Sequence, residues 1–168
     1  MKYIFLNLKR FDVPVELGGV NRLAPVNEWA KTIVEGTQEG LKKYDPAKVE
    51  FVQFFPEAHI LNAVAALCEA SPVKVGCQSL YRADTAVGGN FGAFTSNRPA
   101  SIAKAMGCGG VLIGHCEERN DKAGVLAEAA DFERDVESLA ASGDGPDGDE
   151  DPFASYYGGA RPTTRGGR

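Results

Sequence analysis

Four short runs of apolar residues divide the chain, and each has the length of a β-strand. They are YIFL at 3–6, VEFVQFF at 49–55, VKVGC at 73–77 and GVLIG at 110–114. All four are rich in β-branched or aromatic residues, as strands are. The first and the last are almost continuously apolar, which predicts strands that are covered on both faces of a parallel sheet.

Between these runs, apolar residues recur at the spacing of a helix. One helix is expected to start at Pro25, a second after Pro56, and a short third at Pro99. Gly107 is placed to end the third helix, and a fourth is expected to start with Asn120 or Asp121 as its N-cap. The alternation of strands and helices indicates an α/β fold whose parallel strands are joined by right-handed crossovers.

The end of the chain has a different composition. Ten of the 26 residues at 143–168 are glycine or proline, 144–151 is an acidic cluster, and no apolar periodicity is present. This composition predicts a disordered tail, with an acidic tail or an RG-type nucleic-acid segment as the functional alternatives. We therefore expect a domain at 1–140 and a low-complexity segment at 141–168. The change after about Ala130 also suggests a shift of the reading frame.

Composition and charge exclude several classes of protein. The 168 residues are 43% hydrophobic, enough for a sizeable core, and the net charge of −5 argues against a nucleic-acid partner. The first apolar run is too short for a signal peptide or a membrane span. Four scattered cysteines without a CxxC pair or a histidine at zinc-ligand spacing fit a reducing, cytoplasmic location. We expect no metal, no cofactor and no membrane partner.

Polar and titratable side chains cluster where the expected strands end. Asn7 and Lys9 follow the first strand, Gln78 the third, and His115 and Glu117 the fourth. Side chains at the carboxyl ends of parallel strands converge on one face. Lys9 would attract an anionic substrate, and His115 would act as a proton donor or electrophile. A helix that starts just beyond His115 would favour neutral imidazole there.

Each of these residues also has a simpler interpretation. Lys9 could be a solvated charge at a strand end, and His115 a semi-buried structural histidine. Glu117 and Arg119 could form a surface ion pair, which usually contributes little to stability. Four further side chains are interpreted as core, packing, structural or surface residues: Trp29, His59, Cys77 and Cys116.

Four motifs occur in an order that resembles the triosephosphate isomerase family. They are Asn7-x-Lys9, VGCQ at 75–78, GAFT at 92–95 and IGHCEER at 113–119. Each motif is weak alone, but their order on successive strands is specific, and the resemblance runs from Met1 to about Ala130. It implies the first four βα units of a (β/α)8 barrel, which is an incomplete barrel because the full fold takes about 250 residues.

The resemblance also implies roles for single residues. Lys9 would hold a phosphorylated triose, with Asn7 at the same mouth, and neutral His115 would polarise the carbonyl. Glu117 would pair with Lys9 or help to move protons, and Thr95 would reach into the site of a partner in a homodimer. The implied reaction interconverts dihydroxyacetone phosphate and glyceraldehyde 3-phosphate, in glycolysis and gluconeogenesis.

The chain departs from the family pattern in ways that leave its activity open. Leu8 stands where the family has tryptophan, Asn97 where it has glutamate, and Glu118 where it has arginine. The glutamate base that the family carries on its sixth loop has no counterpart in these residues. The alternative function is a non-catalytic, truncated paralogue that binds a sugar phosphate or joins an oligomer. The alternative fold is an open, doubly wound sheet.

Overall fold

The structure is a computed structural model, which describes residues 1–89 and 91–142. The segment predicted to be a disordered tail, 143–168, lies outside the described residues. The described residues fall into two units, one from Met1 to His115 and one that starts at Cys116. The predicted domain boundary near residue 140 stays a prediction.

The first unit alternates strands and helices in the predicted order. Its parallel strands confirm the four apolar runs, although β4 is shorter than the predicted 110–114, and the helices confirm those expected at Pro25, Pro56 and Pro99. The strands are β1 (Lys2–Asn7), β2 (Val49–Phe55), β3 (Val73–Cys77) and β4 (Gly110–Val111); the helices are the 3-10 turn η1 (Val15–Leu17), α1 (Val26–Leu41), α2 (Glu57–Ala65) and α3 (Ala100–Ala105).

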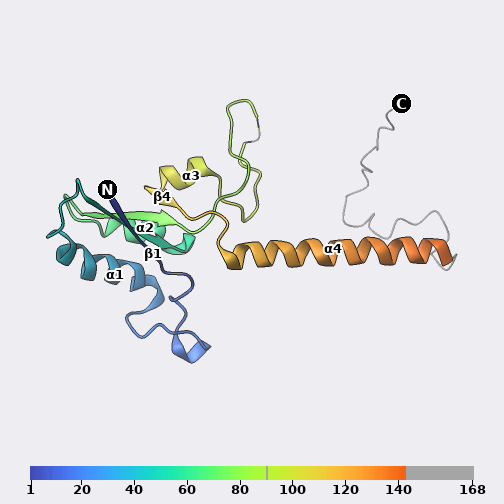
Figure 1. Cartoon of the computed structure of the whole chain (residues 1–168), viewed down its shortest axis with the longest axis horizontal. Coiled ribbons are helices and arrows are strands. Elements are labelled where there is room, and N and C mark those ends of the chain that lie inside the picture. The colour runs from blue at the N-terminus through green and yellow to red at the C-terminus, as the bar shows by residue number, and fades with distance from the viewer. Residues whose placement is uncertain (90, 143–168) are drawn as a thin grey trace. The chain divides into compact units, whose positions relative to one another are not determined.

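The four strands form one curled, half-barrel sheet in the order β1-β2-β3-β4 (Figure 1). Each strand pairs in parallel with the next, for example Phe5 with Val52 and Phe54 with Gly76. A doubly wound sheet would place its strands out of sequence order, so that alternative is wrong. The strand order confirms an incomplete α/β barrel made of its first βα units.

Prolines and one glycine set the helix boundaries. Pro25, Pro56 and Pro99 stand at the N-caps of α1, α2 and α3, where a missing N–H leaves no intrahelical bond unmade. Gly107, with φ 94°, follows the end of α3 in the left-handed region, as predicted. A Cβ at Gly107 would also meet Val64 at 3.0 Å, so the turn packs against α2.

The core lies between the sheet and the helices of the first unit. Trp29 of α1 is buried, as predicted, and its ring meets Phe55 of β2 edge to face at 6.0 Å. Strand β2 is buried on both faces from Phe51 to Phe55, as a central parallel strand should be. The buried cluster comprises Leu8, Trp29, Ala30, Val34, Phe55, Ile60, Ala63, Val75, Cys77 and Ala103.

The opposite face of the sheet is built around Phe54. This side chain is 2% exposed, and Phe5 of β1 meets it edge to face at 5.5 Å. On β3, Gly76 makes room for the ring, because a Cβ there would lie 2.6 Å from Phe54 Cδ1. The aromatic side chain therefore needs the absence of a side chain at Gly76. A Cβ at Gly110 of β4 would make only an ordinary contact with Phe54 Cε1, at 3.5 Å.

Strand β1 differs from the prediction that it is covered on both faces. Tyr3, Ile4, Phe5 and Leu6 are all between 44% and 59% exposed. These side chains are exposed because β1 is an outer strand of the described sheet, and its two faces are only partly covered. The apolar sequence thus indicates a need for burial that the described residues do not meet.

The second unit contains α4 (Cys116–Ser142). The prediction that this helix starts after Asn120 or Asp121 is wrong, because it begins at Cys116. Glu117 and Glu118 occupy its first turn, where their carboxylates interact favourably with the positive end of the helix dipole. Glu118 also accepts a hydrogen bond from Lys122 at 2.6 Å, one turn later. These interactions allow the helix to begin four residues before Asn120. Among the described helices, α4 included, none is long and apolar enough to cross a membrane.

Two glycine-to-alanine changes should shift stability in opposite directions. Gly76→Ala places a methyl group 2.6 Å from the Phe54 ring and should destabilise the fold by about 1–3 kcal/mol. Gly36→Ala, inside α1 with nothing within 4 Å, should stabilise it by about 0.5–1 kcal/mol. Urea unfolding followed by circular dichroism measures both midpoints. A stabilised Gly76→Ala protein would contradict the packing described for Phe54.

Candidate functional site

The end of β1 places Lys9 in a constrained turn. Leu8 is buried in the core and anchors the chain directly before Lys9. Lys9 has φ 43°, in the left-handed region that costs a non-glycine residue of order 1–3 kcal/mol. Its backbone N–H donates to Asn7 Oδ1 at 3.0 Å, which closes the turn. Such strain is kept where the surrounding structure fixes it, and it is concentrated at functional sites.

Gln78 supplies the groups that fix this turn. From the end of β3, its Nε2 donates to Asn7 Oδ1 at 3.2 Å, to the Lys9 carbonyl at 3.0 Å and to the Phe54 carbonyl at 3.3 Å. One amide therefore joins the ends of β1, β2 and β3. The structure brings together the predicted residues Asn7, Lys9 and Gln78, and the Lys9 side chain is exposed.

The fourth strand end carries His115. Strand β4 continues beside β3 through the Leu112 N–H, which donates to the Cys77 carbonyl at 2.9 Å. Gly114 then turns the chain with φ 69°, and His115 follows as a half-buried residue immediately before α4. Lys9 and His115 thus lie beyond the ends of the two outer strands. Glu117 is an exposed residue of α4, in the second unit, with its Oε2 3.0 Å from Cys116 Sγ.

The segment between β3 and α3 carries Thr95 near its tip. Arg98 anchors one end of this segment by donating to Glu57 Oε2 and to the Ser79 carbonyl, both at 2.6 Å. Rings of Tyr81 and Phe94 pack at 5.0 Å. Thr95 is exposed, so this segment presents it away from the core of the first unit.

Asp84 secures the other side of the same segment. Ser101, in the first turn of α3, donates its hydroxyl to Asp84 at 2.6 Å and its backbone N–H at 3.1 Å. These hydrogen bonds from Ser101 lower the pKa of the Asp84 carboxyl below its ordinary value. The carboxylate form therefore ties the long segment to the start of α3.

A buried, hydrogen-bonded Asp12–His59 pair supports the first loop, and its acidic member was not predicted from the sequence. Asp12 and His59 are 2% and 3% exposed, and His59 Nε2 lies 2.9 Å from Asp12 Oδ2. Arg10 donates to the same oxygen at 2.8 Å, and the Trp29 ring lies 5.2 Å from the His59 ring. His59 is therefore a structural residue that joins the loop after β1 to α2. The signal for it was a histidine inside an apolar helix.

The cysteines separate into packing and surface residues. Cys77 is buried in the core, as predicted. Burial, then the neighbouring Cys77, raises the pKa of Cys108 to about 11. The thiol form, which is less nucleophilic than the thiolate, is therefore favoured at neutral pH. The prediction that Cys116 is a packing residue is wrong, because α4 leaves it exposed.

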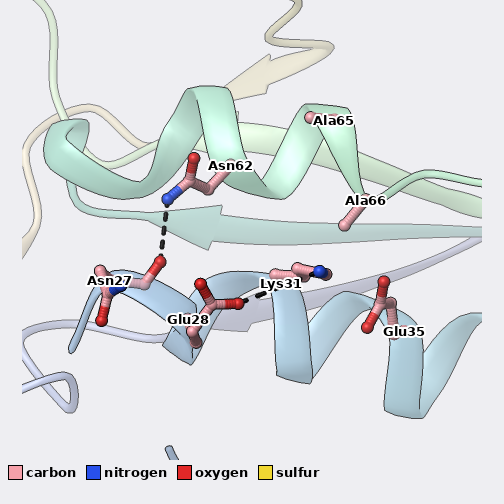
Figure 2. A pocket seen from close by; sticks show the side chains of 7 residues that line it. All are labelled: Asn27, Glu28, Lys31, Glu35, Asn62, Ala65 and Ala66. Carbon is pink, nitrogen blue, oxygen red and sulfur yellow. Dashed lines mark hydrogen bonds and ion pairs between the residues drawn. The ribbon is translucent and has the colours of Figure 1, made fainter. Parts of the chain in front are cut away.

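A pocket of about 220 Å³ lies between α1 and α2, apart from all predicted site residues (Figure 2). Across it, Asn62 Nδ2 of α2 donates to the Asn27 carbonyl of α1 at 3.0 Å. Along α1, Lys31 Nζ lies 4.0 Å from Glu28 Oε2. Its other lining residues are Glu35, Ala65 and Ala66. The charged residues that line this pocket are Glu28, Lys31 and Glu35, and none of the predicted site residues is among its lining.

Comparison with known proteins identifies the family of the chain. The triosephosphate isomerase family profile matches residues 24–138, which is more than half of the 168 residues. The match includes Gln78, Thr95, His115 and Glu117, whereas Asn7 and Lys9 precede it. A comparison with curated proteins finds no match. Family membership supports an isomerase-like enzyme and a sugar-phosphate substrate. This match, with which the sequential parallel strands agree, places the chain in the triosephosphate isomerase family.

Proposed function

We propose that the strand-end site binds a small phosphorylated triose and provides the electrophilic side of triose-phosphate isomerisation. The reaction would interconvert dihydroxyacetone phosphate and glyceraldehyde 3-phosphate. The observation that supports this proposal is the contact of Gln78 with Asn7 and with the Lys9 carbonyl. It holds an exposed lysine in a strained turn at the mouth formed by the strand ends.

Lys9 and Asn7 would bind the substrate. The Lys9 ammonium would offset the charge of the phosphate in charge-assisted hydrogen bonds. Asn7 Oδ1 already accepts from the Lys9 N–H and from Gln78, so its Nδ2 amino group is the end that would donate to the substrate. Both groups lie within three residues of one strand end, which favours binding of a ligand as small as a triose.

His115 would act on the carbonyl. A neutral imidazole would donate a hydrogen bond to the carbonyl oxygen while a base removes a proton from the adjacent carbon, and it would stabilise the enediolate that forms. The isomerisation is complete when that proton returns to the other carbon and a second proton has moved from the original hydroxyl oxygen to the former carbonyl oxygen. Glu117 would pair with Lys9 or help to move these protons. No metal or other cofactor is needed for this sequence of proton transfers.

The general base limits the rate expected of this chain. The family's glutamate lies on the sixth loop, and the matched residues end in the fourth helix. A positioned general base contributes about 10²–10⁴-fold to rate. We therefore expect the chain to bind substrate but to turn it over slowly. As the alternative, the chain would be a non-catalytic paralogue that binds sugar phosphate or joins a complete isomerase in a mixed oligomer.

The segment that carries Thr95 supports a proposal for self-association. Besides Thr95, it exposes Val87 and Phe91 almost fully. Exposed apolar residues near a loop tip favour contact with a protein partner. We propose that Thr95 reaches the substrate site of a second subunit, in a homodimer.

Removing the Lys9 ammonium should weaken binding of the phosphorylated substrate. Lys9→Met removes a charge-assisted hydrogen bond of about 1.5–3 kcal/mol, which corresponds to roughly 10- to 100-fold in Kd. Isothermal titration with dihydroxyacetone phosphate measures this change. Lys104→Met, an equally exposed lysine on α3, should leave Kd unchanged. Unphosphorylated dihydroxyacetone should bind weakly to all three proteins, and equal Kd values for wild type and Lys9→Met would reject the role of Lys9.

Replacing His115 should affect turnover more than binding. His115→Gln keeps a hydrogen-bond donor but loses the imidazole, so any isomerase activity of the chain should fall by about 10²-fold or more while Kd changes little. A coupled isomerase assay gives the rate, and titration gives Kd. If the wild-type chain shows no turnover but forms mixed oligomers with a full-length isomerase, the non-catalytic alternative is supported instead.

A further inference from the structure

An apolar groove lies along β1 beside the C-terminal half of α1. It has a volume of about 480 Å³, and its lining includes Ile4, Leu6, Gly40, Leu41, Phe51 and Gln53. Ile4 and Leu6 remain 50% and 44% exposed within it. Gly40 has no side chain to fill the groove, and a Cβ there would meet nothing within 4 Å. The surface is shaped for an apolar element that lies against both β1 and α1.

A buried polar atom indicates that the occupant also donates a hydrogen bond. Gln53 lines the groove and is 4% exposed. Its Nε2 donates to Thr37 Oγ1 at 2.9 Å, whereas its buried Oε1 has no partner among the described residues. Buried acceptors are almost always paired in folded proteins. The groove is therefore suited to an element that is mainly apolar and carries a donor.

Helix α4 has the properties of such an element. Its side chains Val125, Leu126 and Phe132 are 61%, 71% and 52% exposed. A helix in water gains most of its stability by packing an apolar face against another surface. Its sequence also offers donors at Lys122 and Arg134.

Charge favours the same pairing. Helix α4 contains eight acidic and three basic residues. The Phe51 end of the groove has a small excess of positive charge, because Lys2, Lys43 and Lys48 outnumber Asp45 and Glu50 there. Tyr44 packs on Phe51 at 5.5 Å, and Lys43 Nζ lies 5.2 Å from the Tyr44 ring centre. Lys2, whose N–H donates to the Lys48 carbonyl, stands at the start of the same strand. A basic rim and an acidic helix attract each other.

We propose that the groove binds α4 of a second copy of this chain, so that two chains close one eight-stranded barrel. Strand β4 of each copy would pair with β1 of the other, and a twofold axis along the barrel keeps all eight strands parallel. In parallel α/β folds, the right-handed crossover after a strand returns to the neighbouring strand on the side away from the preceding one. In the described sheet, β1 is the outer strand on the side opposite β4. A second copy, rather than the chain's own helix, therefore fits the groove.

Charged substitutions in the groove should separate the two copies. In sedimentation equilibrium without substrate, the 168-residue chain should associate through the groove, whether or not the Thr95 segment joins further copies. Leu6→Asp should raise the Kd of the groove-mediated association by roughly 30-fold or more, as at an interface hot spot. Leu61→Asp is the matched control, because Leu61 is a 61% exposed leucine on α2, outside the groove. Val125→Asp, on the helix side of the interface, should act like Leu6→Asp even if the Leu6 variant fails to fold.

Cross-linking between labelled chains tests the occupant directly. A ¹⁵N-labelled Gly40→Cys chain is mixed with an unlabelled Leu126→Cys chain and treated with a bis-maleimide. Mass spectrometry should find a peptide that joins position 40 of one chain to position 126 of the other, and it should be missing when either chain is wild type.

A monomeric chain, or a dimer insensitive to Leu6→Asp and Val125→Asp but broken by Thr95→Asp, would overturn the proposal. A 40–126 link formed only within a doubly substituted monomer would overturn it too.

Discussion

The side-chain amide of Gln78 is the interaction on which the candidate site depends. Its Nε2 is hydrogen-bonded to groups at the ends of β1, β2 and β3, so one residue fixes the relative position of three strand ends. Those bonds also hold Lys9 at φ 43°, a conformation that a lysine adopts only under constraint. Without this amide, three oxygens would lose a hydrogen-bond donor: Asn7 Oδ1 and the carbonyl oxygens of Lys9 and Phe54. The Lys9 turn would then relax.

The strand order and the main helix boundaries follow from local patterns in the sequence. Apolar runs at strand length and prolines before helical stripes need only neighbouring residues, and parallel strands joined by helices then take sequential order in a barrel arc. The grouping of Asn7, Lys9 and Gln78 was predictable for the same reason. All three follow strands whose carboxyl ends must lie at one edge of the sheet.

Other features depend on contacts between residues far apart in the chain. Asp12 and His59 are 47 residues apart, and nothing near Asp12 in the sequence indicates that its carboxylate is buried against an imidazole. The start of α4 was missed because Asn120 and Asp121 are good N-caps by residue type. Glu117 and Glu118 nevertheless stabilise a helix that begins earlier. The exposure of β1 was missed because an apolar run reports a need for burial, not the surface that provides it.

The open side of the sheet and the candidate site are linked through β4 and α4. His115 lies between them, so an element that fixes α4 against a second sheet also fixes the chain on both sides of His115. Closure by a second copy would order two electrophilic sites in one barrel. It would not add a general base, because each copy contributes the same four units. Under these proposals, binding of a phosphorylated triose and its turnover would be separable properties, because the strand-end groups would bind the substrate whereas turnover would also require a general base.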